Sequence, residues 1–469
     1  MPFTSGPSRW SDVWLTTAAR GISTCGDFLA ASALTLALQS AGAGGMAVSG
    51  LLLAATLPLV ALAPLTGRLA DRVDSRNLLV GVGLAQATIC VVLAYTGHPA
   101  LVIGLVALLA AGLAVTQPTL SALVPAMVRA ADLPRATALN QTAGPLGALA
   151  GPALAGLLVG GFGVRLPLLI DAGSYLALVA AGLLIRTRRG GSRRPAPAAT
   201  HGAAAGAAPA VAWRLRRDPL LVAMVATIAG VIGAVGAINV VEVFFIRETL
   251  GSSTTMYGLV TGSWTLGLLG GAWLFARLAR RLTDDGGLLG AYLALLAGCC
   301  LMILLSAAVP AALLLVPIWL IGGLGNGGAN VFDNMLLARR VPEAARGRAY
   351  ATFGGAVQGA AMAGYLLGGL LLEVADPRPL VAGCGVAGLL VVAAVVVPVR
   401  RAVRAERSAV RSAAPHPAVP TDRPESVVPQ PAARPAGSPD AAAERSGGAH
   451  LRRLGEEPGA ELATPGPAR

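Results

Sequence analysis

The sequence contains no lysine and little charge of either sign. All 36 basic residues are arginine, charged residues make up 13% of the 469 positions, and aromatic residues make up 4%. Hydrophobic residues, in contrast, make up 55%. Ordinary soluble domains carry about 25% charged residues. The composition therefore excludes a soluble multidomain protein and indicates a chain that crosses a membrane several times.

Cysteine and histidine are also scarce, which excludes several kinds of site. The five cysteines lie inside apolar runs, at positions 25, 90, 299, 300 and 384. Their odd number and their spacing fit neither a disulfide framework nor a metal site, so we interpret them as small core residues. The sequence contains neither a phosphate-binding P-loop nor a nucleophile with its base. We expect a protein that is not an enzyme and has no cofactor or metal.

Apolar runs long enough to cross a bilayer, about 20 residues each, recur along the chain. The net charge of +13 does not indicate nucleic acid as a partner, because the arginines are spread between these runs and form no single basic face. We predict an all-α membrane protein with twelve spans, at residues 14–38, 46–66, 77–96, 99–124, 138–160, 165–185, 220–245, 256–276, 287–308, 311–337, 349–372 and 379–399.

The arginines alternate between two sets of loops. One set carries 20 arginines, and the other carries only Arg165, Arg247 and Arg378. Arginine-rich loops face the cytoplasm, so we expect both termini there and a multi-pass monomer in the plasma membrane. No small-residue cleavage site follows the first apolar stretch, and we expect this span to be retained as an anchor.

Two regions are predicted not to span the membrane. Residues 187–218 form a linker rich in Arg, Gly, Ala and Pro, which separates a six-span bundle at 1–186 from a second bundle at 219–400. Residues 401–469 have too little apolar bulk to fold, so we expect a disordered cytoplasmic tail.

A short repeat supports two equivalent halves. RLADRV from Arg68 and RLARRL from Arg277 are 209 positions apart, and RATA from Arg135 and RAYA from Arg348 are 213 apart. Both pairs stand at equivalent places in the two predicted bundles. The repeat predicts a parallel duplication.

The stretch GRLADRVDSR gathers charge between the second and third spans. Gly67 followed by Asp71 and Arg72, with Arg76 behind them, resembles the G-x-x-x-D-R loop signature of the major facilitator superfamily. Asp74 departs from that signature, since the family usually has Gly there. The resemblance covers about residues 10–400 and implies two pseudo-symmetric six-helix bundles, with this loop as a gate near the eleventh span. We expect Gly67 to form a tight turn and the arginines to lie at anionic headgroups.

The fifth span contains GALAGPALAG, which resembles a signature of that superfamily's exporters. Its motif residues are Gly147, Gly151, Pro152 and Gly156. A stripe of small residues that includes Gly144, Gly147 and Gly151 permits close contact with a neighbouring helix, and the eighth span offers Gly258, Gly262 and Gly270 as a matching stripe. The phrases QPTLSALVP and RVPEAARGRAYA resemble the efflux branch that includes enterobactin and macrolide exporters.

Polar residues inside the spans are functional candidates, because charge at the bilayer centre costs about 2.5–3.5 kcal/mol. Asp27 and Glu242 are the candidate proton-coupling groups, since burial disfavours a charged carboxyl. The candidates for a substrate cavity lie in spans one, four, seven and ten, which line the central cavity in the family: Arg20, Gln117, Asn239, Asn326, Asn330, Asp333 and Asn334.

The last four of these residues fall within an arc of about 100° of one helix, so we expect one polar stripe that faces protein or water. Arg20 has an alternative position with its head at the lipid headgroups, and each candidate has the alternative of an interhelical hydrogen bond. Asp171 and Gln358 have no assigned role.

Together these features predict a secondary transporter that exports a small amphipathic molecule, such as a drug, a siderophore or a secondary metabolite, in exchange for protons. Two alternatives stay open. One is a proton-coupled nutrient importer of the same fold, and the other is a transport-inactive sensor or scaffold that acts through its tail.

Overall fold

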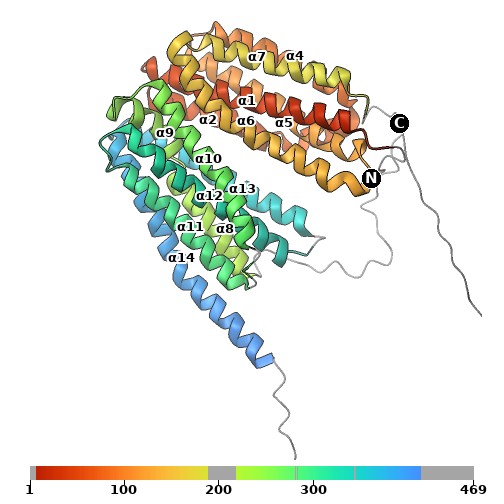
Figure 1. Ribbon diagram of the computed structural model, residues 1–469. Helices are drawn as coiled ribbons and strands as arrows, with labels where there is room; N and C mark the ends of the chain where they lie inside the picture. The colour runs from red at the N-terminus through yellow and green to blue at the C-terminus, as the bar shows by residue number, and fades with distance from the viewer. Residues whose placement is uncertain (1–6, 189–217, 280, 283, 343–344, 414–469) are drawn as a thin grey trace, which may run out of the picture. The chain divides into compact units, whose positions relative to one another are not determined.

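Helices make up the described part of this computed structural model, which covers residues 7–188, 218–279, 281–282, 284–342 and 345–413 (Figure 1). No strand is found in these ranges. Twelve of the helical segments are long and apolar enough to cross a bilayer, so the predicted twelve spans are confirmed. Most of the predicted linker and the chain after Ala413 lie outside the described residues.

The first half contains six spans and one additional short helix. The spans are α1 (Trp10–Ser40), α2 (Gly44–Ala61), α4 (Ser75–Ala94), α5 (Pro99–Met127), α6 (Leu133–Phe162) and α7 (Arg165–Leu184). The short helix α3 (Ala63–Arg72) follows α2 after a break at Leu62. Gly67 lies inside α3, so the tight turn predicted at this glycine is wrong.

The second half contains the other six spans. The seventh span is broken into α8 (Pro219–Val235) and α9 (Ile238–Phe244), followed by a π-helical turn at Phe245–Thr249. The remaining spans are α10 (Thr254–Ala279), α11 (Asp285–Ser306), α12 (Leu315–Arg340), α13 (Arg346–Leu372) and α14 (Pro377–Ala413).

The same pairs of spans pack against each other in both halves. In the first half α1 packs on α6 and α7, α4 packs on α5 and α7, and α2 packs on α5. In the second half α8 packs on α13 and α14, α11 packs on α12 and α14, and α10 packs on α12. Each pair in one half has its counterpart six spans later in the other. The two bundles are therefore pseudo-symmetric, as the repeat predicts.

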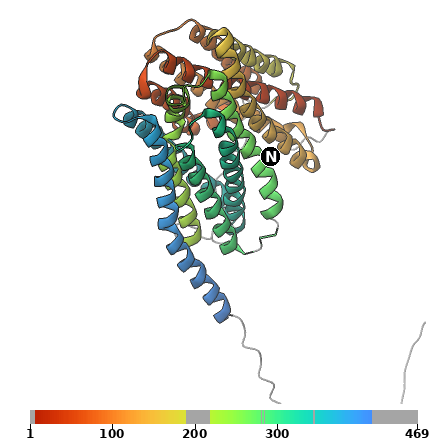
Figure 2. The same cartoon turned by 60° about the vertical axis from the view of Figure 1, so that its left-hand side comes forward.

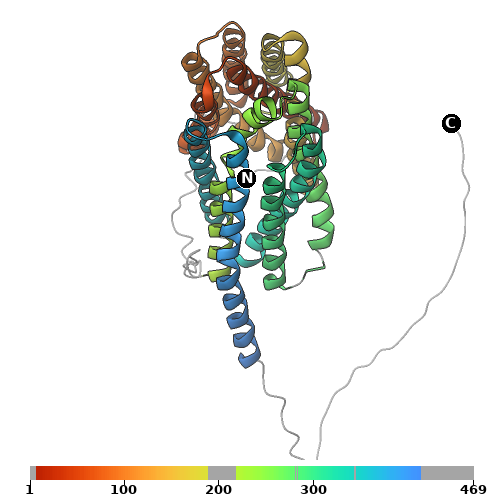
Figure 3. The same cartoon turned by 90° about the vertical axis from the view of Figure 1, so that its left-hand side faces the viewer.

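The last helix is longer than predicted. Residues 401–413 continue α14 and do not begin the predicted disordered tail. The reason is local, because this segment is rich in Ala and Arg, which are strong helix formers, and it has no Gly or Pro before Pro415. Figures 2 and 3 show α14, in blue, extending past the helices that pack on it.

The halves meet mainly through two helix pairs, α6 with α10 and α2 with α13, and α9 also contacts α1 and α2. Between α2 and α13, the hydroxyl of Ser49 donates to the carbonyl oxygen of Tyr365 at 2.8 Å. The amide of Gln39 donates to the carboxylate of Glu248 at 3.0 Å. These contacts lie toward the ends of the spans that are opposite the arginine-rich loops.

Candidate functional site

Two carboxyl side chains lie in the first bundle at the contact of α1 with α7. The hydroxyl of Tyr175 on α7 donates to Oδ1 of Asp27 on α1 at 2.5 Å. Asp171, one turn before Tyr175, is 1% exposed. It accepts hydrogen bonds from Oγ of Ser174 at 2.9 Å and from Sγ of Cys90 on α4 at 3.2 Å. Three helices therefore position one acidic site.

Gly26 makes the close approach of α1 to this site possible. A Cβ at Gly26 would lie 2.9 Å from Cβ of Ser174 and would overlap the carboxylate of Asp171. The absence of a side chain on α1 therefore leaves room for the buried acid of α7. Asp27 follows directly in the chain and is half-buried.

Both acids line a cavity of about 90 Å³ inside the first bundle. Tyr175 also lines it, and the rest of the wall is apolar, with residues such as Ala30, Leu52 and Leu109 from α1, α2 and α5. A carboxylate that loses its hydration without a cationic partner is costly, and uptake of a proton relieves this cost. The arrangement can therefore hold protons away from bulk water.

The sequence pattern left Asp171 without a role, and the structure places it beside Asp27. It also identifies Tyr175, Ser174 and Cys90, which sequence reasoning missed as site residues. A signal was present, because Asp171, Ser174 and Tyr175 are spaced i, i+3 and i+4 on one face of an otherwise apolar span.

The second half also has a carboxyl on its first span, and a tyrosine of the next span donates to it. The hydroxyl of Tyr257 on α10 donates to Oε1 of Glu242 on α9 at 3.3 Å. Glu242 is half-buried. It lies after the break in the seventh span, where α13 comes close: a Cβ at Gly364 would lie 2.8 Å from Cα of Gly236. Broken spans of this kind form ion and substrate sites in transporters.

The polar residues of α12 do not share one environment, contrary to the single stripe predicted. Asp333 is 3% exposed and accepts from the amide of Asn334 at 3.0 Å. Asn330 and Asn334 are exposed, and Asn326 is half-buried. The amide of Asn334 also donates to the carbonyl oxygen of Asn330 at 2.6 Å. Asp333 thus turns into the second bundle, whereas the two exposed asparagines turn away from it.

Arg20 reaches from α1 to α5, where its Nη1 lies 3.4 Å from Oγ of Ser121. Its Nε is buried, with no hydrogen-bond partner among the described residues. The guanidinium therefore lies against neighbouring helices, which differs from the alternative of a headgroup position. Gln117 is half-buried one turn earlier on α5, and Gln358 is half-buried on α13.

Asn239 is exposed on α9, and its amide donates to the carbonyl oxygen of Gly236 in the break before it. This bond is local to the seventh span. It satisfies part of the polar backbone that the break at Gly236 exposes.

The charged loop of the first half is helical up to Arg72. The backbone nitrogen of Arg76 donates to the side chain of Asp74 at 2.8 Å, so Asp74 caps the start of α4. This cap is a physical reason for an aspartate at the position where the signature usually has glycine. Arg72 is exposed and Arg76 is half-buried. The side chain of Asp71 lies outside the described part.

The glycine stripe of α6 faces α1, which corrects its expected match with the eighth span. A Cβ at Gly147 would lie 2.8 Å from the backbone nitrogen of Cys25, and one at Gly151 would lie 2.8 Å from that of Leu29. A different face of α6 meets α10. There a Cβ at Gly156 would lie 2.5 Å from the carbonyl oxygen of Thr254.

The eighth span divides its glycines in the same way. A Cβ at Gly258 would lie 2.5 Å from the carbonyl oxygen of Pro152 on α6. Gly262 also faces α6, near Ala153, whereas Gly270 faces Leu324 on α12. The predicted neighbourhood of the fifth and eighth spans is confirmed, and the residues that form it are Pro152, Gly156 and Gly258.

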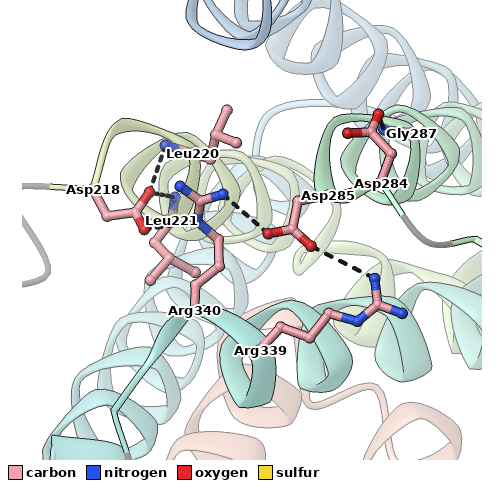
Figure 4. A network of polar contacts seen from close by, with 8 residues as sticks. All are labelled: Asp218, Leu220, Leu221, Asp284, Asp285, Gly287, Arg339 and Arg340. Carbon is pink, nitrogen blue, oxygen red and sulfur yellow. Dashed lines mark hydrogen bonds and ion pairs between the residues drawn. The ribbon is translucent and has the colours of Figure 1, made fainter. Parts of the chain in front are cut away.

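An ion-pair network ties three helix ends together in the second half (Figure 4). Arg340 at the end of α12 lies 2.7 Å from a carboxylate oxygen of Asp218 and 3.1 Å from one of Asp285. Asp218 also caps α8 by accepting from the backbone nitrogens of Leu220 and Leu221 at 3.1 and 3.2 Å. This end of the second bundle is therefore held as one piece.

Comparison with known proteins identifies the fold. A sequence profile described as transmembrane secretion effector matches residues 5–425. Comparison with curated protein sequences finds no significant match. Among solved structures, the chain is similar to a bacterial homologue of the human lysosomal transporter Spinster, with 14% identity, a TM-score of 0.60, and coverage of 87% of this chain and 99% of that one.

Two further solved transporters are similar at the same level. A bacterial homologue of the iron transporter ferroportin has 17% identity and a TM-score of 0.62, with 84% of this chain and 99% of that one covered. The nucleoside transporter NupG has 15% identity and a TM-score of 0.63, with 82% and 99% covered. These neighbours and the family are membrane transporters. The chain belongs to the transmembrane secretion effectors, a family of major facilitator superfamily transporters.

Proposed function

We propose that this transporter exports a small amphipathic molecule from the cytoplasm in exchange for protons. The observation that carries the proposal is the site formed by Asp27, Asp171 and Tyr175, which places two acids in a mostly apolar cavity. Such a site takes up protons from one side and releases them to the other when its access alternates. The secretion family and the exporter-like motif of the fifth span support the outward direction.

Glu242 is the proposed second coupling group, because it also lies within a span and accepts a hydrogen bond from a tyrosine hydroxyl. Substrate would bind between the bundles, near the candidate residues of spans one, four, seven and ten. The count of 20 arginines against 3 supports cytoplasmic termini and a plasma-membrane location. In that orientation, the contacts between the halves close the outer side, and the loop with Asp71, Arg72 and Arg76 acts as the inner gate.

The exported molecule can be identified first, from the toxicity profile of an efflux-deficient host with and without the gene. A drug, a siderophore or a secondary metabolite fits the resemblance to enterobactin and macrolide exporters. With that molecule, inverted membrane vesicles carrying the wild-type protein should accumulate it when a proton gradient is imposed.

Asp27→Asn should abolish accumulation, because an amide cannot exchange the coupling proton. Downhill flux of the same molecule should persist, and this retained flux separates lost coupling from misfolding. Asp132→Asn is the matched control, since Asp132 directly precedes α6, accepts from Ser8 and lies outside the acidic site. Accumulation by Asp27→Asn at the wild-type rate would remove Asp27 from the coupling role.

The two alternatives give different results in the same vesicles. A nutrient importer accumulates its substrate in right-side-out vesicles and not in inverted ones. A sensor that acts through its tail loses its effect when residues 414–469 are deleted, whereas a transporter keeps its flux. The deletion begins at residue 414 because α14 continues to Ala413.

A further inference from the structure

Helices α11 and α14 touch closely at two points and leave a groove between them. Toward one end, a Cβ at Gly385 would lie 2.6 Å from the backbone nitrogen of Leu304. At the other end, a Cβ at Gly286 would lie 2.6 Å from Cγ1 of Val403. The groove between these contacts has a volume of about 500 Å³, which is in the range of small-molecule sites.

The wall of the groove is apolar for most of its length. Gly290, Ala294 and Ala297 line it from α11, and their small size creates the space; Val396 lines it from α14. Gly290 and Ala294 are exposed. Nothing lies within 4 Å of the place where a Cβ of Gly290 would stand. The groove is therefore open at its side and fits an extended apolar chain.

Two arginines lie at one end of this groove. Arg400 and Arg404, one turn apart on α14, line it and are exposed. The acids at the start of α11 do not line the groove: Asp284 caps the helix by accepting from the backbone nitrogen of Gly287 at 2.9 Å, and Asp285 pairs with Arg340 (Figure 4). Arg400 and Arg404 are therefore the charged groups among the described residues that line this end of the groove, and they fit an anionic group.

The depth of the arginines matches the headgroup region of a bilayer. Arg400 and Arg404 follow Pro377, the first residue of α14, by 23 and 27 positions. At about 1.5 Å per residue, Arg400 and Arg404 lie roughly 35 and 40 Å along the helix from Pro377. A bilayer has a hydrocarbon core of about 30 Å, and its headgroups extend it to about 40–45 Å. The apolar part of the groove then lies at the depth of the acyl chains.

We propose that this groove binds an anionic phospholipid. One acyl chain lies against Gly290 and Ala294, and the phosphate and anionic headgroup lie against Arg400 and Arg404. Arginine suits this role because its planar guanidinium binds phosphate oxygens through two hydrogen bonds. The proposal is independent of the direction and substrate of transport.

The test is lipid binding to the purified, delipidated full chain, measured by native mass spectrometry. The probes are phosphatidylglycerol and phosphatidylcholine with the same acyl chains. The wild type should bind phosphatidylglycerol more tightly. The double variant Arg400→Gln/Arg404→Gln should bind it about 30-fold more weakly, which corresponds to about 1 kcal/mol for each arginine. Its binding of phosphatidylcholine should weaken by less, because that lipid has the same phosphate but a choline cation that offsets its charge.

Arg401→Gln is the matched control, since Arg401 is exposed on the same turn but does not line the groove. Gly290→Leu fills the groove and should weaken the binding of both lipids. It should not destabilise the protein, because Gly290 is exposed and leucine favours the helix more than glycine does. Glycerol phosphate, which has no acyl chain, should not compete. The proposal fails if Arg401→Gln has the effect of the double variant, or if Gly290→Leu leaves both affinities unchanged.

Discussion

Tyr175 and its neighbours on α7 decide how the acids of the first bundle are held. The tyrosine hydroxyl donates to Asp27, while Ser174 and Cys90 donate to Asp171. Asp27 was recognisable from the sequence as an acid in mid-span. The rest of the site was not, because Asp171 and Tyr175 come from α7 and Cys90 comes from α4, and they meet Asp27 only when three helices pack. Polar residues in lipid-facing segments have no other means of being satisfied.

Tyr175→Phe removes one hydroxyl and keeps the ring, so it tests the bond to Asp27. We expect it to lower the free energy of unfolding in detergent by about 0.6–1.7 kcal/mol, the range for hydrogen bonds between membrane helices. Tyr292→Phe is the matched comparison, because the Tyr292 hydroxyl is buried without a hydrogen-bond partner among the described residues. Removing the Tyr292 hydroxyl should leave the free energy of unfolding unchanged or raise it. Equal destabilisation by both variants would contradict the role of Tyr175.

At the scale of elements, α6 uses two faces for two neighbours. Gly147 and Gly151 lie against α1 inside the first bundle, whereas Pro152 and Gly156 lie against α10 of the second. The sequence predicted a helix with a small-residue face and a contact with the eighth span. It did not predict which glycines make that contact, because small residues occur on several sides of α6 and only packing selects among them.

Gly156→Ala should destabilise the contact between α6 and α10. The added Cβ would lie 2.5 Å from the carbonyl oxygen of Thr254, so backbone must move. We expect a loss of about 1–3 kcal/mol, the usual cost of overpacking, measured as a lower unfolding midpoint. Gly161→Ala on the same helix has nothing within 4 Å of its Cβ. That control should be neutral or slightly stabilising, and a similar loss for it would contradict the explanation.

At the scale of the whole molecule, the two bundles meet mainly through α2 with α13 and α6 with α10. The hydrogen bond between Gln39 and Glu248 also joins the two bundles, at the end of the spans opposite the arginine-rich loops. A transporter that alternates its access must break these contacts once in every cycle. Contacts at one end therefore belong to one state of the cycle.

Linking Gln39 and Glu248 should stop transport. The variant Gln39→Cys/Glu248→Cys is treated with a short, reducible thiol crosslinker, since the amide and carboxylate atoms are 3.0 Å apart. We expect flux to fall to background after crosslinking and to return after reduction. Gln39→Cys treated in the same way is the control and should keep its flux. Unchanged flux in the linked double variant would show that this end does not open during the cycle.

The sequence by itself determined the membrane class and the twelve spans, because bilayer thickness and hydrophobic run length act locally on each segment. It also marked Asp27 and Glu242, since an isolated carboxyl in an apolar run is conspicuous. Only the tertiary structure decided that Asp171 joins Asp27, that α6 divides its glycines between two helices, and that α11 and α14 leave a groove. These features depend on which helix faces meet, and a local pattern does not contain that information.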